Sequence, residues 1–138
     1  MLKIRIKRLK KEAVIPKCAL EGDAGMDIVA ITKKETEKEV EYGTGLSFEI
    51  PENYVCLIFP RSSVSNKDLI LANCVGVLDS GYRGELRLKF KKIGKESYNI
   101  GDKIGQIMIL PFPKIFFEEV KGLSSSVRGK GGFGSTGN

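Results

Sequence analysis

The last eleven residues combine side chains that could bind a phosphorylated ligand carrying an aromatic ring. They run Arg128-Gly-Lys-Gly-Gly-Phe-Gly-Ser-Thr-Gly-Asn138, with five glycines, two cations, two hydroxyls and one ring. Glycine-rich backbone is too flexible to hold one shape unaided, and its N–H groups can wrap phosphate oxygens. Arg128 offers a planar guanidinium for phosphate, and Phe133 offers a face for a base. Composition alone also fits a disordered tail, but the isolated Phe133 favours a mobile lid.

Two further segments place reactive side chains next to turns. Pro60-Arg-Ser-Ser63 follows an apolar run, and an arginine with two hydroxyls at a helix start would make an anion site. A plain strand-to-helix cap explains the serines equally well. Asp79 and Tyr82 flank a turn and could both reach one bound molecule, although turn formation is the ordinary use of Asp and Gly.

The residue types and motifs that the sequence lacks exclude several kinds of chemistry. The chain has no histidine, which removes the usual general base and the Ser-His and Cys-His nucleophile pairs. It has no Gly-x-x-x-x-Gly-Lys-Ser/Thr motif, so an ordinary P-loop is excluded. Cys18, Cys56 and Cys74 are odd in number and widely spaced. We expect them to be small buried residues, and not a disulfide framework or a zinc site.

The net charge of +6 comes from the N-terminal segment, because residues 1–11 hold six cations and no acid. A strand over residues 2–9 would point cations to one side and apolar residues to the other: Lys3, Arg5 and Lys7 against Leu2, Ile4 and Ile6. No aromatic side chain lies among these cations, so a solvated strand face is favoured over a nucleic-acid patch. We therefore expect no nucleic-acid partner.

The length of 138 residues predicts one domain, and a hydrophobic fraction of 41% is typical of soluble globular proteins. No apolar run is long enough for a membrane span, and residues 1–11 lack the apolar block of a secretory signal. We expect no membrane partner and a cytoplasmic protein, or a nuclear or virus-encoded intracellular one.

Runs with a period of two dominate the chain and predict short strands. They cover residues 2–9, 26–31, 54–59, 85–90, 106–110 and 115–120. One short helix is expected over residues 62–69, with Ser62 and Ser63 capping its first amides. Many short strands separated by turns indicate an all-β sandwich or closed barrel. We expect a β domain over residues 1–127 and a flexible arm over residues 128–138.

Five segments in this order resemble the motifs of the trimeric dUTP diphosphatase family. They are Ala24-Gly-Met-Asp27, Pro60-Arg-Ser-Ser63, Gly76-Val-Leu-Asp-Ser-Gly-Tyr-Arg-Gly-Glu85, Gly101-Asp-Lys-Ile-Gly-Gln106 and Arg128-Gly-Lys-Gly-Gly-Phe-Gly-Ser-Thr-Gly137. Each is weak alone, but the joint pattern over residues 22–138 is specific. The resemblance implies a distorted jelly-roll-like β-sandwich or barrel of the β-clip type with a mobile glycine-rich C-terminal arm.

The resemblance also implies the reaction, which is hydrolysis of dUTP to dUMP and diphosphate by attack of water on the α-phosphorus. This reaction limits uracil in DNA and supplies dUMP for thymidylate synthesis. The family's water-activating aspartate falls on Asp79, and a carboxylate with a reference pKa of about 3.9 is ionised at neutral pH. The implied cofactor is Mg²⁺, held mainly by substrate oxygens and waters, with Asp27 reaching it through the water shell.

By the same resemblance, the remaining site residues divide into two groups. The phosphates would be bound by Arg61, Ser62, Ser63, Gln106, Arg128, Gly134, Ser135 and Thr136. The uracil and deoxyribose would be bound by Asn73, Gly76, Val77, Leu78, Tyr82 and Phe133, with the Tyr82 ring excluding a ribose 2′-hydroxyl. The family builds each site from three subunits, so a homotrimer with shared sites is implied.

Two other functions stay open. A dCTP deaminase of the same superfamily would have a related fold, although the segment around Asp79 is of the uracil type. A regulatory module that uses a nucleotide-sensing fold to contact a protein or nucleic acid is the second alternative, because the first strand is basic. Ammonia release from dCTP, or DNA binding without diphosphate release, would favour one of these readings.

Overall fold

The computed structural model describes residues 2–135, which form ten strands and one 3₁₀ helix. In chain order these are β1 (Arg5–Arg8), β2 (Met26–Val29), β3 (Thr32–Glu35), β4 (Glu39–Gly43), β5 (Leu46–Glu49), β6 (Tyr54–Phe59), η1 (Ser62–Asn66), β7 (Leu69–Leu71), β8 (Gly76–Leu78), β9 (Arg87–Lys92) and β10 (Lys103–Pro111).

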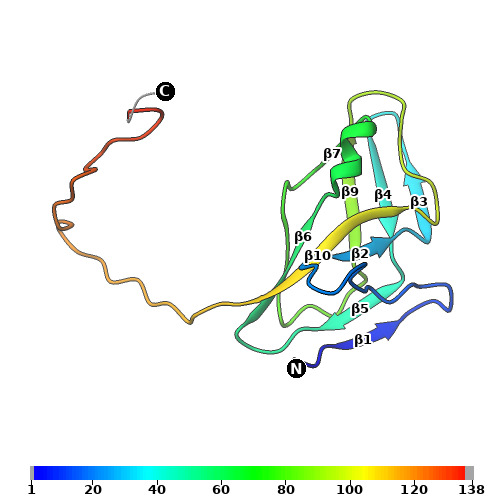
Figure 1. Cartoon of the computed structure of the whole chain (residues 1–138), viewed down its shortest axis with the longest axis horizontal. Helices are drawn as coiled ribbons and strands as arrows, with labels where there is room; N and C mark the ends of the chain where they lie inside the picture. Colours follow the sequence, from blue (N-terminus) through cyan, green and yellow to red (C-terminus); the bar gives the residue numbers. More distant parts are fainter. Residues whose placement is uncertain (1, 136–138) are drawn as a thin grey trace.

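The strands form two four-stranded antiparallel sheets and a two-stranded one (Figure 1). The first large sheet has the order β2-β10-β6-β8 and the second has the order β3-β4-β9-β7. Strands β1 and β5 pair as a ribbon, with Arg5 opposite Glu49. None of the sheets in the described part of the chain closes on itself, so the architecture is an open, jelly-roll-like sandwich and not a closed barrel.

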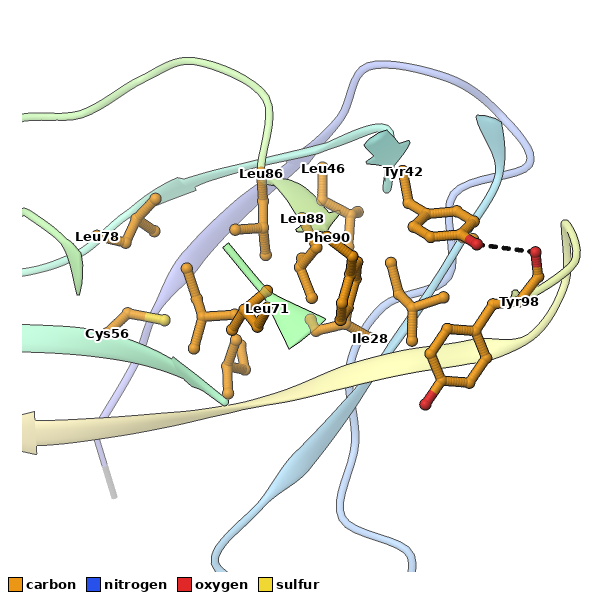
Figure 2. Close-up of a cluster of buried hydrophobic side chains, with 14 of the residues drawn as sticks. Ile28, Tyr42, Leu46, Cys56, Leu71, Leu78, Leu86, Leu88, Phe90 and Tyr98 are labelled. Atoms are coloured by element: carbon orange, nitrogen blue, oxygen red, sulfur yellow. Dashed lines mark hydrogen bonds between the residues drawn. The ribbon is translucent and has the colours of Figure 1, made fainter. Parts of the chain in front are cut away.

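The core lies between the two large sheets because the strands alternate inward apolar with outward polar side chains. In β4 and β9, Val40 faces Phe90 and Tyr42 faces Leu88, and all four side chains are buried. The Tyr42 hydroxyl donates a hydrogen bond to the Tyr98 carbonyl oxygen at 2.9 Å (Figure 2). This bond satisfies the polar end of the buried ring.

Five of the six expected strands are present: β6 matches the predicted residues 54–59, and the other four have shifted ends. Residues 115–120 form no strand and lie exposed, so that prediction is wrong for the chain by itself. The helix is a 3₁₀ helix that ends at Asn66, and residues 69–71 form β7 instead. No serine side chain caps the helix, so the predicted capping is also wrong.

The N-terminal strand has the predicted two faces. Leu2, Ile4 and Ile6 line an apolar pocket, whereas Lys3 and Arg5 line a polar one. The cysteine prediction is wrong for two of the three residues, because Cys18 and Cys74 are exposed and Cys56 alone is buried. All three thiols are free, and burial raises the pKa of Cys56 to about 11.

After Pro111 the chain leaves the sandwich and runs outward as an extended, exposed segment (Figure 1). We call the part from residue 112 onward the arm. It departs earlier than residue 128, where the sequence indicated a flexible end, and the boundary of a functional lid stays a prediction. Among residues 2–135 there is no helix with the length and apolar character needed to cross a membrane.

Candidate functional site

The body carries two small clefts that together contain most of the predicted site residues. The first, which we call the hairpin cleft, has a volume of about 250 Å³. It is lined by Ile58, Asn73, Gly76, Val77, Leu78, Asp79, Tyr82, Glu85, Leu86 and Arg87. The second, which we call the ion-pair cleft, also has a volume of about 250 Å³ and is lined by Ala19, Asp23, Ala24, Gly25, Asp27, Arg61, Ser62 and Gln106.

The hairpin cleft is shaped by the turn that follows β8. The Tyr82 amide donates to the Asp79 carbonyl oxygen at 3.1 Å, which closes the turn and leaves the Asp79 side chain exposed. The Tyr82 hydroxyl donates to the Glu85 carbonyl oxygen at 3.1 Å. A Cβ on Gly84 would lie 2.3 Å from that hydroxyl oxygen, so glycine is required for the ring to fold back over the turn.

The far side of this turn is held by the Glu85 carboxylate. Its Oε1 accepts a hydrogen bond from the Gly45 amide at 2.8 Å, and its Oε2 accepts one from Arg87 Nε at 2.9 Å. The floor of the cleft is close-packed, because a Cβ on Gly76 would lie 2.8 Å from Ile58 Cδ1. The result is a shallow, partly apolar cleft lined by the exposed Asp79 carboxylate and the hydrogen-bonded Glu85 carboxylate, which suits a flat ring and a sugar.

The ion-pair cleft is built where β2, β10 and the end of β6 meet. Asp27 Oδ1 lies 2.7 Å from Arg61 Nε, and Asp27 Oδ2 lies 2.7 Å from Lys103 Nζ. Partial burial acts to raise the pKa of Asp27, but the Lys103 ammonium and the Arg61 guanidinium outweigh it and lower that pKa. Asp27 is therefore a carboxylate at neutral pH, set between two cations.

Gln106 lies opposite Asp27 in the strand pairing. Its Nε2 donates to the Pro60 carbonyl oxygen at 3.1 Å, which fixes the carboxamide beside Arg61. A Cβ on Gly25 would lie 2.3 Å from Gln106 Oε1, so a larger residue there would force the carboxamide to shift. Cations, hydroxyls and an amide gathered at one place are the donor types that bind phosphate.

Some predicted residues lie outside both clefts. Ser63 is hydrogen-bonded through its hydroxyl to the Tyr98 hydroxyl at 3.2 Å, on the inner side of η1. Arg128, Phe133, Gly134 and Ser135 lie on the arm, where Phe133 is fully exposed. Thr136 lies outside the described residues.

The structure brings to the clefts further residues to which the sequence analysis gave no role, and four of them shape the two sites. Glu85 and Arg87 line the hairpin cleft, and Gly25 and Lys103 shape the ion-pair cleft. Glu85 and Arg87 follow Tyr82 shortly afterwards in the sequence, so this closeness could have indicated that they line the same cleft. Lys103 lies in the segment of residues 101–106 that resembles a family motif, but it is three positions from Gln106 and a regular strand would point the two to opposite faces.

The two clefts lie at different points along β6, because β8 of the hairpin cleft pairs with residues 56–58 and Arg61 of the ion-pair cleft follows the end of the strand. Leu78, next to Asp79, pairs with Cys56 near the start of this strand, whereas Arg61 follows its end. At roughly 3.3 Å per residue, about 16 Å of strand separates Cys56 from Arg61. Asp79 and Arg61 of one chain therefore do not converge on a single phosphate group.

The residues of the ion-pair cleft fit a divalent cation only in an outer role. Within residues 2–135, no group of three His, Cys, Asp or Glu side chains is placed to hold a metal ion. Both Asp27 oxygens accept a cationic partner, but each retains a further lone pair for a water molecule. This donor set suits a hydrated Mg²⁺ whose remaining ligands come from phosphates.

A jelly-roll-like β-sandwich with a cleft for a ring and a cleft for anionic groups defines a nucleotide-binding protein. The family model described as dUTPase matches residues 11–137. The deoxyuridine 5′-triphosphate nucleotidohydrolase of Clostridium acetobutylicum is 41% identical, with 99% of this chain and 98% of that protein covered. That of Clostridium tetani is 42% identical, with 97% and 96% covered. The chain belongs to the dUTPase family.

Solved structures agree with this assignment. A Staphylococcus bacteriophage 80alpha dUTPase with dUpNHpp is similar over 100% of both chains, with a TM-score of 0.86 and 27% identity. A dUTPase from phage phi11 of S. aureus, described with a structural Mg(II) ion, has a TM-score of 0.75 and 25% identity, covering 88% of this chain and 98% of that one. The jelly-roll-like fold expected from the sequence is confirmed.

Proposed function

We propose that the chain hydrolyses dUTP to dUMP and diphosphate, with Asp79 as the general base. The observation that carries the proposal is the grouping of Asp79 with Asn73, Tyr82 and the backbone of β8 in one cleft. An ionised carboxylate at the rim can orient a water molecule and take its proton as the water attacks the α-phosphorus. The P–O bond to the diphosphate breaks, and the proton passes to Asp79.

The hairpin cleft binds the nucleoside part of dUTP. Gly76, Val77 and Leu78 offer backbone groups to the uracil edge, and Asn73 offers a side-chain amide. The Tyr82 ring packs beneath the sugar and excludes a ribose 2′-hydroxyl by its bulk. Its hydroxyl contact with Glu85 supports this role, because the contact fixes the ring against the turn.

The ion-pair cleft binds the phosphates through Arg61, Ser62 and Gln106. Ser63 contributes through its backbone, since its hydroxyl already contacts Tyr98. Asp27 is the residue that reaches a hydrated Mg²⁺, which neutralises phosphate charge when bound. The arm residues Arg128, Phe133, Gly134, Ser135 and Thr136 close over the base and phosphates and exclude water.

We also propose that the protein is a homotrimer in which one site combines clefts from different chains. The separation of Asp79 and Arg61 along β6 supports this assembly, because a single chain does not bring them to one phosphate group. The arm supports it too: Ile115, Phe116 and Phe117 are exposed, and an extended apolar segment that lies outside the sandwich is suited to contact with a second chain. The free thiols fit a reducing, cytoplasmic compartment.

Diphosphate release from dUTP tests the proposed activity. We expect turnover of dUTP to exceed that of UTP, dTTP and dCTP, and to fall when Mg²⁺ is removed with a chelator. Equal rates with UTP would contradict the role of Tyr82. Ammonia release from dCTP would favour the deaminase alternative, and salt-dependent DNA binding without turnover would favour the regulatory one.

A mixing experiment tests the shared site. Asp79→Asn and Arg61→Ala are each expected to be inactive, and the two are unfolded, mixed in equal amounts and refolded together. If the two residues act from different chains, random assembly restores about a quarter of the parent activity. Activity that stays at the level of the separate variants would show that both residues act within one chain.

A further inference from the structure

Lys103 reaches the ion-pair cleft because β10 contains an irregularity. Gln106 pairs with Asp27 and Gly105 with Ile28, and the register then shifts so that Lys103 pairs with Val29. In a regular ladder Ile104 would occupy that place, on the same face as Asp27. The extra residue sends Ile104 into the core, where it is 0% exposed, and turns Lys103 toward the cleft.

Lys103 and Arg61 each contact a different oxygen of the Asp27 carboxylate. Arg61 contacts Oδ1 through Nε, and Lys103 contacts Oδ2, each at 2.7 Å. A carboxylate with both oxygens available tends to bind a guanidinium through two parallel hydrogen bonds. Here Lys103 occupies the second oxygen, and the close contact of Arg61 with Asp27 is made through Nε.

We propose that Lys103 is a positioning residue that keeps the Arg61 guanidinium available for the polyphosphate of the substrate. By holding Asp27 Oδ2, the ammonium prevents Asp27 from swinging onto Arg61 and consuming its two terminal amino groups. Lys103 acts through Asp27 and does not itself contact the phosphates. The inference rests on the proposed function, since it assigns the ion-pair cleft to phosphate binding.

The first test compares binding of dUpNHpp and dUMP to Lys103→Met, Lys103→Gln and Lys103→Arg by calorimetry. Loss of one charge-assisted contact predicts about tenfold weaker binding of dUpNHpp by Lys103→Met. Binding of dUMP is expected to change less than twofold, and Lys103→Arg is expected to restore the parent affinity. Lys95→Met is the matched control, because Lys95 is exposed and lies in a surface turn. Thermal unfolding verifies that each variant is folded, and Lys103→Gln replaces Lys103→Met if the latter is not.

The second test separates positioning from direct contact. In an Asp27→Asn background the carboxylate is gone, so adding Lys103→Met should weaken dUpNHpp binding no further. Additive losses would show that Lys103 contacts the phosphates itself and would overturn the proposal. Parent-like dUpNHpp binding by Lys103→Met would also overturn it. If the parent chain does not release diphosphate from dUTP, the proposed function fails, whatever the variants show.

Discussion

The hairpin cleft and the ion-pair cleft have the same volume and opposite construction. Nine of the ten residues that line the hairpin cleft come from one stretch, residues 73–87, and the cleft offers backbone groups and apolar walls. The ion-pair cleft draws on three separate segments, residues 19–27, 61–62 and 103–106, and is organised by the Asp27, Arg61 and Lys103 ion pairs. The hairpin cleft is formed mainly by one local stretch of the chain, whereas the ion-pair cleft is formed by the pairing of strands that are distant in sequence.

This difference matches what each cleft has to bind. A neutral ring is recognised by shape and by backbone hydrogen bonds, which a single turn can supply. A chain of phosphates needs several cations, and cations placed together without a carboxylate would repel one another. Asp27 offsets that repulsion in the absence of ligand, so the ion-pair cleft is already organised before the phosphates bind.

Asp79→Asn should greatly slow the hydrolysis of dUTP while leaving the structure of both clefts unchanged. The amide has the shape of the carboxylate but no basic oxygen, so kcat should fall by roughly 10²- to 10⁴-fold. Affinity for dUpNHpp should stay near that of the parent. Diphosphate release and calorimetry measure the two effects, with Ser80→Ala as the neighbouring control. Turnover at the parent rate would exclude Asp79 as the base.

Removal of residues 128–138 should affect both clefts together, because the proposed lid covers base and phosphates. We expect kcat to fall roughly a hundredfold through loss of substrate alignment, with an unchanged thermal unfolding temperature. A chain lacking residue 138 alone is the control. If the truncated chain turns over dUTP at the parent rate, residues 128–138 have no part in the reaction.

Gly25→Ala should weaken the ion-pair cleft alone. The added methyl group would lie 2.3 Å from Gln106 Oε1, so the carboxamide must move and lose its contact with Pro60. We expect the KM for dUTP to rise about tenfold, the cost of one hydrogen-bonded phosphate ligand, with a smaller change in kcat. Gly122→Ala is the control, since no atom lies within 4 Å of its added Cβ. A parent-like KM would show that Gln106 does not bind phosphate.

Tyr82→Phe should perturb the hairpin cleft only slightly. It removes the hydroxyl contact with Glu85 but keeps the ring, so kcat/KM for dUTP should fall roughly two- to fivefold. The preference for dUTP over UTP should remain in this variant and be lost in Tyr82→Ala. The ratio of kcat/KM for the two nucleotides measures this, and retained preference in Tyr82→Ala would contradict the steric role.

The smallest effect concerns a site outside both clefts. The Lys92 and Lys33 ammonium groups lower the pKa of Glu35 from its ordinary 4.5 to about 2. Because the folded pKa is the lower one, the stabilisation is fully present above pH 4.5 and is lost as the pH falls toward 2. Glu35→Gln should therefore be less stable than the parent at pH 6, with the difference shrinking on acidification. Urea unfolding at several pH values measures it, with Glu37→Gln as the control. A difference independent of pH would contradict this ion-pair assignment.

Many of the strands could be predicted from the alternation of apolar and polar side chains along the sequence. The segments that were predicted wrongly or not at all have physical explanations. Strand β3 consists of Thr32-Lys-Lys-Glu35, which has no apolar alternation to reveal it, and it forms because it pairs with β4. Leu69 and Leu71 were expected in or after a helix, but both are buried beside β9. Tertiary pairing decided these segments against their local preference.

The sequence by itself determined the family motifs, most of the alternating strands and the turn from Asp79 to Tyr82, because each of these depends on neighbours along the chain. Only the tertiary structure decided that Asp27, Arg61 and Lys103 form one cluster, since their approach depends on the register of β2 against β10. A single extra residue in that pairing reverses the face on which Lys103 lies. Side-chain periodicity cannot reveal such a shift, because it becomes visible only when the second strand is in place.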